Sequence, residues 1–198
     1  MDAAYNEYQR RRLQIEGMRV RDVDIVFAGD SIIEEGYWQH WFPEKDILNV
    51  GAPRTTTYNL YYRRNHITRV HPDKIFIMVG INDLLISKVF LEIEQLVRMY
   101  ELLLLDLEDE APHAKIYVNS IIPTAEFWER DFNLNVIAPI NERIEEMCLA
   151  VGCKFIDLTT ELVASDGFLD HRFTDDGLHL NALGYQKWLE KISPMVLE

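Results

Sequence analysis

Apolar runs of strand length alternate along this chain with segments in which apolar residues recur every three or four positions. The run at 75–79 is apolar throughout, as a parallel strand covered on both faces must be. Strands that alternate with helices need crossover connections, so the pattern predicts an α/β fold with a parallel sheet. Five strands are expected, at 25–28, 46–50, 75–79, 116–122 and 153–158.

Helices are expected in the intervals between these strands. From Ser87, a candidate N-cap, to Pro112 the apolar residues form one stripe, which predicts a long helix with one buried face. A second stripe begins at Ile140 and is ended by Gly152, and a last helix is expected to start near Asn181.

The chain is expected to form a single domain over residues 1–198, because no repeat or Gly/Ser-rich linker divides it. Its length suffices for one sizeable hydrophobic core. Residues 1–17 predict a polar helix packed outside the sheet. Cys148 and Cys153 do not form a Cys-x-x-Cys pair and are interpreted as small buried hydrophobic residues.

The charge balance excludes some classes of partner. The chain has 33 Asp and Glu against 20 Lys and Arg, a net charge of −13. This surplus repels phosphate backbones and anionic bilayers, so neither nucleic acid nor stable membrane association is expected. No stretch of about 20 apolar residues could span a bilayer, and no signal peptide is visible. We expect a soluble cytoplasmic protein, whose oligomeric state the sequence does not indicate.

Several common catalytic motifs are missing. The chain has no dinucleotide-binding Gly-x-Gly-x-x-Gly, no P-loop and no His-Glu-x-x-His. Residues 29–33 read Gly-Asp-Ser-Ile-Ile and therefore lack the last glycine of the nucleophile elbow Gly-x-Ser-x-Gly. The ordinary α/β-hydrolase fold is disfavoured accordingly.

Small polar loops follow the first three predicted strands and contain Ser31, Gly51 and Asn82. The carboxyl ends of parallel strands lie along one edge of the sheet, where ligands bind in open α/β folds. Asp176 and His179 precede the last predicted helix and can fold back to the same edge. The sequence therefore predicts a site built from these loops.

Together the four segments, from Gly29 to His179, resemble the SGNH (GDSL-type) hydrolases, a family of esterases and lipases. The resemblance implies a flavodoxin-like three-layer α/β/α sandwich with no metal and no cofactor. It implies that Ser31 is the nucleophile, His179 the general base and Asp176 the carboxylate that orients the imidazole. It also implies that the Asn82 amide and the Ser31 backbone N–H stabilise the oxyanion.

The chemistry of these residue types fits those roles. A serine hydroxyl is a weak nucleophile and needs a base within hydrogen-bond reach. A histidine can take that proton and return it to the leaving group, while a carboxylate holds its tautomer. Loss of one oxyanion donor typically costs about 2.7–4 kcal/mol of transition-state stabilisation, so Asn82 should matter strongly.

One position departs from the family pattern Asn-x-Gly-x-x-Gly-x-Thr. Arg54 stands where the second glycine donates its backbone N–H to the oxyanion. That N–H is retained, but its loop must suit a residue with a Cβ, so Gly51 is the alternative donor. We hypothesise that the Arg54 guanidinium points over the pocket and favours an anionic or polyhydroxylated substrate.

Two further acid–histidine combinations need consideration. Asp175 lies next to Asp176 and could orient the imidazole instead, although the family spacing favours Asp176. Asp170 and His171 form a second pair, which we interpret as part of a solvated loop.

Other polar and aromatic residues also lie near the predicted edge. Asp30, Asp83 and Asn49 are expected to shape loops by accepting hydrogen bonds from backbone N–H groups. Trp38 and Trp128 are candidate substrate-binding residues, since both lie near the predicted edge, although aromatic residues there could equally belong to the core.

The sequence predicts a serine esterase that hydrolyses a small-molecule ester through an acyl-enzyme. O-acetyl groups on a carbohydrate or similar small alcohol are favoured, because no long apolar lid is visible and the aromatic residues suit sugar stacking. The alternatives are a lysophospholipase, an acyl-thioester hydrolase and a ligand-binding module without turnover.

Overall fold

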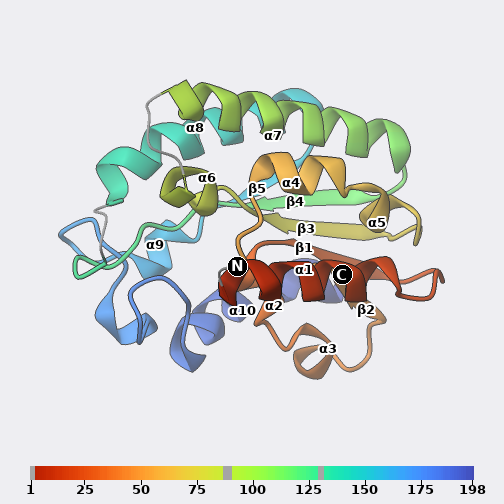
Figure 1. Ribbon diagram of the computed structural model, residues 1–198, viewed down its shortest axis with the longest axis horizontal. Helices are drawn as coiled ribbons and strands as arrows, with labels where there is room; N and C mark the ends of the chain where they lie inside the picture. Colours follow the sequence, from red (N-terminus) through yellow and green to blue (C-terminus); the bar gives the residue numbers. More distant parts are fainter. Residues whose placement is uncertain (1–2, 87–90, 129–131) are drawn as a thin grey trace.

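The computed structural model describes residues 3–86, 91–128 and 132–198. Its centre is a parallel sheet with the strand order β2-β1-β3-β4-β5, which runs through the middle of Figure 1. The strands are β1 (Ile25–Gly29), β2 (Ile47–Asn49), β3 (Lys74–Met78), β4 (Lys115–Asn119) and β5 (Lys154–Ile156).

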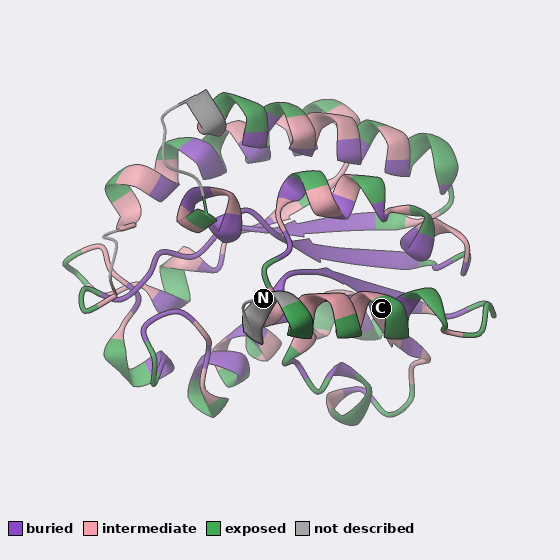
Figure 2. Ribbon diagram, viewed as in Figure 1, coloured by how far each residue is buried: buried purple, intermediate pink, exposed green. Residues whose placement is uncertain are grey.

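Alternation within β1 explains why the sheet is covered on both faces. Val26 and Ala28 belong to the hydrophobic cluster on one face, and Ile25 and Phe27 to the cluster on the other. All four are buried, as the period of two along a strand requires. In Figure 2 the strands are buried almost throughout, whereas the outer sides of the helices are exposed.

The helices of the first face each contribute apolar side chains to the cluster beneath them, among them Ile15, Leu60, Ile67, Tyr100 and Ile144. They are α1 (Ala3–Glu16), α4 (Thr57–Tyr62), α5 (Asn65–Thr68), α7 (Leu91–Glu110) and α8 (Leu134–Val151). A short helix, α6 (Ile81–Ile86), follows β3 and adds Ile81 and Leu84 to this cluster.

The second face is rich in aromatic residues. Phe27, Phe76 and Tyr117 stack in a row across β1, β3 and β4, and Trp38 continues the stack on Phe27. The elements that cover this face are α2 (Ser31–Glu34), α3 (Trp38–Trp41), α9 (Thr159–Leu162), the 3₁₀ helix η1 (His171–Phe173) and α10 (Ala182–Leu197). These layers and the strand order confirm the predicted flavodoxin-like sandwich.

The strands predicted at 46–50, 75–79 and 153–158 differ from the observed strands by at most two residues at either end, and the larger differences are at the end of β4 and the start of α8. The strand predicted at 116–122 ends at Asn119, because the side chain of Asn141 takes over both backbone hydrogen bonds of Ile121. Helix α8 begins at Leu134, six residues before Ile140, with Asn133 as its N-cap. Pro139 lies inside this helix, and a proline in a periodic pattern obscures the true start.

Of the other predicted helix limits, one agrees with the structure and one lies outside the described residues. Asn181 is the N-cap of α10, as expected. Helix α1 occupies the segment predicted as a peripheral helix. The proposed N-cap Ser87 lies outside the described residues. No helix within the described ranges is long and apolar enough to cross a bilayer.

Candidate active site

Ser31 lies at the point where β1 turns into α2. Gly29 ends the strand, and a Cβ at this position would lie 1.9 Å from the carbonyl oxygen of Met78 on β3, so only glycine allows this approach. Asp30 is the N-cap of α2 and its carboxylate accepts the Ile32 amide at 3.0 Å. Ser31 is thus the first residue of the helix, above the boundary between β1 and β3 where the strand order reverses.

The structure brings Ser31, His179 and Asp176 together. Ser31 Oγ lies 2.9 Å from His179 Nε2, and His179 Nδ1 lies 2.6 Å from Asp176 Oδ2. The second carboxylate oxygen of Asp176 accepts the backbone amides of Leu178 and His179. Partial burial acts to raise the pKa of Asp176, but the hydrogen bonds from His179 and from these amides outweigh it, so the pKa is lowered. Asp176 therefore faces the imidazole as a carboxylate.

The turn that carries Asp176 is closed by its own side chains. Thr174 Oγ1 accepts the Gly177 amide at 2.9 Å, which folds the chain back before His179. Asp175 points elsewhere, since its carboxylate accepts from the Asn181 side chain. Of the two neighbouring acids, only Asp176 contacts the imidazole among the described interactions.

The second predicted acid–histidine pair does not join the site. The Asp170 carboxylate binds the guanidinium and the backbone amide of Arg172, and these contacts lower its pKa to about 2. His171 is exposed, and its Nε2 lies 3.6 Å from Glu126 Oε1. Only His171 fits the interpretation of this pair as a solvated loop, because the Asp170 side chain is 15% exposed and caps η1.

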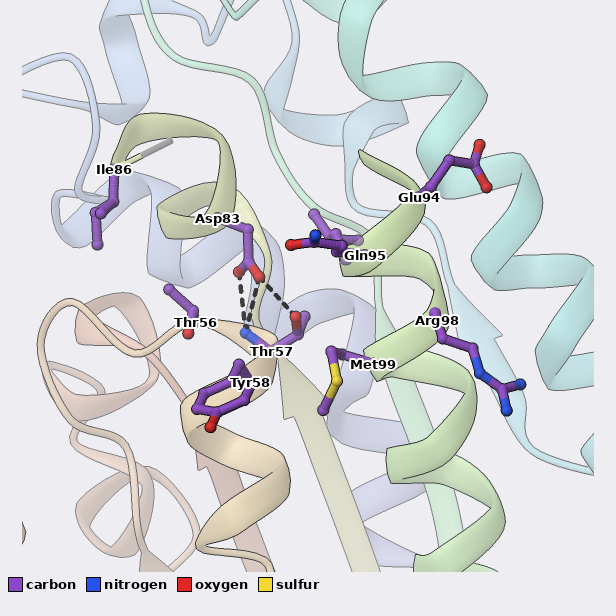
Figure 3. Close-up of a pocket in the computed structure, with 10 residues that line it drawn as sticks. Thr56, Thr57, Tyr58, Asp83, Ile86, Glu94, Gln95, Arg98 and Met99 are labelled. Carbon is purple, nitrogen blue, oxygen red and sulfur yellow. Dashed lines mark hydrogen bonds between the residues drawn. The ribbon is translucent and has the colours of Figure 1, made fainter. Parts of the chain in front are cut away.

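Asn82 projects from the start of α6, directly after β3. Its side chain is buried, and Nδ2 donates to the Thr55 carbonyl at 3.3 Å. A carboxamide has two N–H groups, so this contact orients the Asn82 amide, and its predicted role as an oxyanion donor stays a prediction. Asp83 accepts the Thr57 amide and hydroxyl at 2.9 and 2.6 Å, which fastens α6 to the start of α4 (Figure 3).

Arg54 lies in the turn between β2 and α4 with φ 58°, the left-handed region that favours glycine. The family pattern has glycine at this position, and Arg54 adopts a backbone conformation that favours glycine although it carries a Cβ. The Arg54 side chain is exposed. The alternative donor, the Gly51 amide, already donates to Asn49 Oδ1 at 2.9 Å.

Three polar residues have the loop-shaping contacts expected for them. Asn49 Oδ1 accepts the Gly51 amide, as expected, and Nδ2 donates to the carbonyls of Ile33 and Glu34, which joins the end of β2 to α2. Asp30 is fully buried, and this burial raises its pKa to about 7 despite the hydrogen bond from Ile32. Asp83 holds Thr57, as described above.

The two tryptophans proposed to bind substrate lie in different surroundings. Trp38 is 1% exposed, and its ring stacks on that of Phe27 with 4.0 Å between the ring centroids. Its indole N–H donates to the Ile33 carbonyl. It belongs to the core and offers no face to a ligand, so its assignment as a substrate-binding residue is wrong. Trp128 is half-buried against the core of the other face, and its role stays a prediction.

Glu35 lies beside the reacting groups and was not predicted from the sequence. Glu35 Oε1 lies 3.9 Å from His179 Nε2, the nitrogen that contacts Ser31. Glu35 follows Ser31 by four residues, and its amide donates to the Ser31 carbonyl at 2.9 Å. The spacing of four within a helix, which puts two side chains on one face, is the signal that could have identified it.

A cavity of about 720 Å³ lies between α4, α6 and α7, and Asp83 is one of the residues that line it. Figure 3 shows that its walls combine apolar side chains with polar ones. They include Tyr58, Ile86, Gln95 and Met99. Asn82 and Asp83 are neighbours on α6, so this cavity adjoins the element that carries a predicted oxyanion donor.

A parallel sheet of this strand order, with Ser31, His179 and Asp176 gathered above its switch point, defines the class of SGNH hydrolases. Among the described residues, no group of three His, Cys, Asp or Glu side chains could hold a metal ion. The chain belongs to the GDSL-like lipase/acylhydrolase family, whose sequence profile matches residues 27–187. This family assigns it to the ester hydrolases.

Several known proteins are similar to this chain. Platelet-activating factor acetylhydrolase IB subunit alpha1 of Bos taurus is 24% identical over 176 residues, which cover 83% of this chain and 71% of that protein. A GDSL-like lipase from Bacteroides thetaiotaomicron has a TM-score of 0.81 at 20% identity and covers 98% of both chains. An acetylxylan esterase from Geobacillus stearothermophilus, solved as a catalytic mutant, has a TM-score of 0.63 at 15% identity, covering 88% of this chain and 96% of its own. The two structures share the fold.

Proposed function

We propose that this protein is a serine esterase that removes short acyl groups, above all O-acetyl groups, from a carbohydrate or similar small alcohol. The observation that carries the proposal is the continuous chain of contacts from Ser31 Oγ through His179 to Asp176, at 2.9 and 2.6 Å. A base within this distance of a serine hydroxyl is what nucleophilic catalysis requires.

In the first half of the reaction, Ser31 Oγ attacks the ester carbonyl carbon and its proton passes to His179 Nε2. The carbonyl oxygen becomes an oxyanion, for which the Asn82 side chain and the backbone amides of Ser31 and Arg54 are the proposed donors. His179 then gives the proton to the departing alcohol oxygen, and the acyl group stays on Ser31. The Asp176 carboxylate holds the imidazole tautomer and stabilises the imidazolium.

In the second half, a water molecule replaces the alcohol. His179 takes a proton from the water as the water oxygen attacks the acyl carbon, and the same donors hold the oxyanion again. Collapse of this intermediate returns the proton to Ser31 Oγ and releases the carboxylic acid. Each proton removed is thus returned, and no redox partner is needed.

Support for acetyl esters comes from the names of similar proteins. An acetylhydrolase and an acetylxylan esterase both occur among them. The adjoining cavity, whose walls include Ile86 and Met99, favours a second candidate, a lysophospholipase or acyl-thioester hydrolase that accommodates a longer chain. A series of p-nitrophenyl esters separates the two, because a maximum at acetate supports the first and a maximum beyond octanoate supports the second.

The mechanism is tested by labelling with a fluorophosphonate and by ester hydrolysis. Ser31→Ala should abolish labelling and lower kcat at least about 1,000-fold, since the nucleophile itself is removed. Ser165→Ala, which changes an exposed serine in the loop after α9, is the matched control and should behave like the wild type. Full esterase activity in Ser31→Ala would overturn the mechanism. Absence of labelling and hydrolysis in the wild type would favour a binding module.

A further inference from the structure

Glu35 lies beside the catalytic histidine without being part of the predicted triad. Its carboxylate oxygen is 3.9 Å from His179 Nε2, whereas Asp176 occupies the opposite nitrogen, Nδ1. Helix α2 imposes this position, because the Glu35 amide donates to the carbonyl of Ser31 one turn earlier. Two carboxylates therefore flank one imidazole, and only one of them orients it.

The position of Glu35 relative to the reaction follows from the role of Nε2. In the proposed function, on which this inference rests, Nε2 delivers its proton to the oxygen of the departing alcohol. That oxygen must come within hydrogen-bond distance of Nε2, so a carboxylate 3.9 Å from the same nitrogen borders the space of the alcohol. The acyl group lies on the other side of the carbonyl carbon.

The Glu35 carboxylate is available to a ligand. About half of its side chain is exposed (49%), and His179 is the only ion-pair partner recorded for it among the described residues. The neighbouring Glu34 is instead bound to Arg11 at 3.3 Å. Asp176 and Glu7 are close enough to act electrostatically on Glu35, so the alcohol side of the site is acidic.

We infer that Glu35 determines the specificity for the leaving alcohol. It favours alcohols that present hydroxyl or ammonium groups next to the ester oxygen, because these donate hydrogen bonds or positive charge to the carboxylate. It disfavours alcohols with a phosphate or other anion at that place. The substrate class is therefore an acyl ester of a polyhydroxylated or amino-bearing alcohol.

Three aryl acetates of similar shape test this inference. They carry a meta-trimethylammonio, a meta-tert-butyl or a meta-sulfonate group, and each kcat/KM is divided by the rate of hydroxide-catalysed hydrolysis of the same ester. At a half-exposed site, we expect the wild type to favour the cationic over the neutral ester about threefold. Glu35→Gln should bring this ratio close to one and should raise the relative rate of the anionic ester.

The control removes the same charge at the opposite edge of the sheet. Glu108 is exposed near the end of α7, just before the amino end of β4, so Glu108→Gln should keep the wild-type ratio. Added salt should shrink the preference in the wild type but not in Glu35→Gln.

Other outcomes overturn the inference and do so separately from the proposed function. An unchanged ratio in Glu35→Gln, or an equal loss on all three esters, would show that Glu35 does not select the alcohol. If the wild type preferred the anionic ester, the charge preference for the alcohol would be set by Arg54 and not by Glu35. Failure of the proposed function itself would appear as hydrolysis that Ser31→Ala leaves unchanged.

Discussion

At the scale of single residues, two aspartates near the same histidine have opposite pKa shifts. Asp30 is fully buried, and the loss of hydration outweighs its backbone hydrogen bonds, chiefly that from Ile32, and raises its pKa to about 7. Asp176 is partly exposed and accepts hydrogen bonds from His179 and two amides, so its pKa is lowered. The number of donors and the degree of burial, rather than the residue type, decide which acid serves as the ionised partner of the imidazole.

The raised pKa of Asp30 predicts a pH-dependent stability. A carboxyl whose pKa rises from 3.8 to about 7 on folding opposes folding when it is ionised. This penalty is complete above about pH 7, shrinks as the pH falls, and vanishes below about pH 4. Asp30→Asn keeps the N-cap acceptor without the charge, so it should stabilise the protein near pH 8 by up to about 4 kcal/mol.

Urea unfolding near pH 8, pH 6 and pH 4 measures this effect. The gain of Asp30→Asn should disappear at the lowest pH. Asp166 accepts the amide two residues later in the same way but is exposed, so Asp166→Asn is the matched control and should show little change. A gain from Asp30→Asn that stays constant across the three pH values would contradict the prediction.

At the scale of elements, helix α1 illustrates how a polar helix is held on a domain. Ile15 is buried against the core, but much of the attachment is polar. Arg11 donates to the carbonyls of Gly51 and Asn49 at 2.9 and 3.0 Å and pairs with Glu34 on α2. One side chain of α1 thus joins the loop after β2 to the helix that begins with Ser31.

Removing the Arg11 side chain, which is 18% exposed, should therefore destabilise the protein. Arg11→Ala leaves two partly buried carbonyls without a donor, so we expect the free energy of unfolding to fall by about 1–3 kcal/mol. Arg10 is a suitable control, because it is exposed and its only recorded ion pair among the described residues is with Glu7 at 3.9 Å. Arg10→Ala should change the free energy by less than about 0.5 kcal/mol. Equal losses in the two variants, measured by urea unfolding, would argue against this role of Arg11.

At the scale of the whole molecule, the candidate site depends on contacts between distant parts of the chain. Ser31 and His179 are 148 residues apart in sequence. Helix α10, which follows His179, is fastened to α2 by the Tyr185 hydroxyl, which donates to the Ile32 carbonyl at 2.6 Å. It is fastened to β4 by the Trp188 indole, which donates to Asn119.

Tyr185→Phe tests this long-range link. The change removes one hydroxyl and leaves the buried Ile32 carbonyl without its donor, which should cost about 1–3 kcal/mol of unfolding free energy. Because the link joins the elements next to Ser31 and His179, we also expect slower labelling of Ser31 by a fluorophosphonate. Tyr37→Phe removes a hydroxyl from an exposed tyrosine and should leave both quantities unchanged. Normal stability with a normal labelling rate in Tyr185→Phe would refute the link.

The strands, their parallel arrangement and the pairing of Asp176 with His179 could be predicted from the sequence. The sheet depends on apolar runs such as 75–79, and the choice of Asp176 over its neighbour Asp175 came from the resemblance to the family, whose acid stands three residues before the histidine. Local periodicity and short turns are decided by nearby side chains, so they are visible in a linear sequence.

Only the tertiary structure decided the rest. Trp38 belongs to the core because Phe27 and Trp188 close around it, and β4 ends at Asn119 because Asn141 of another element captures Ile121. The approach of Glu35 to His179 likewise needs α2 and the loop before α10 to meet. These features arise from contacts across large sequence separations, which a pattern of neighbouring residues does not contain.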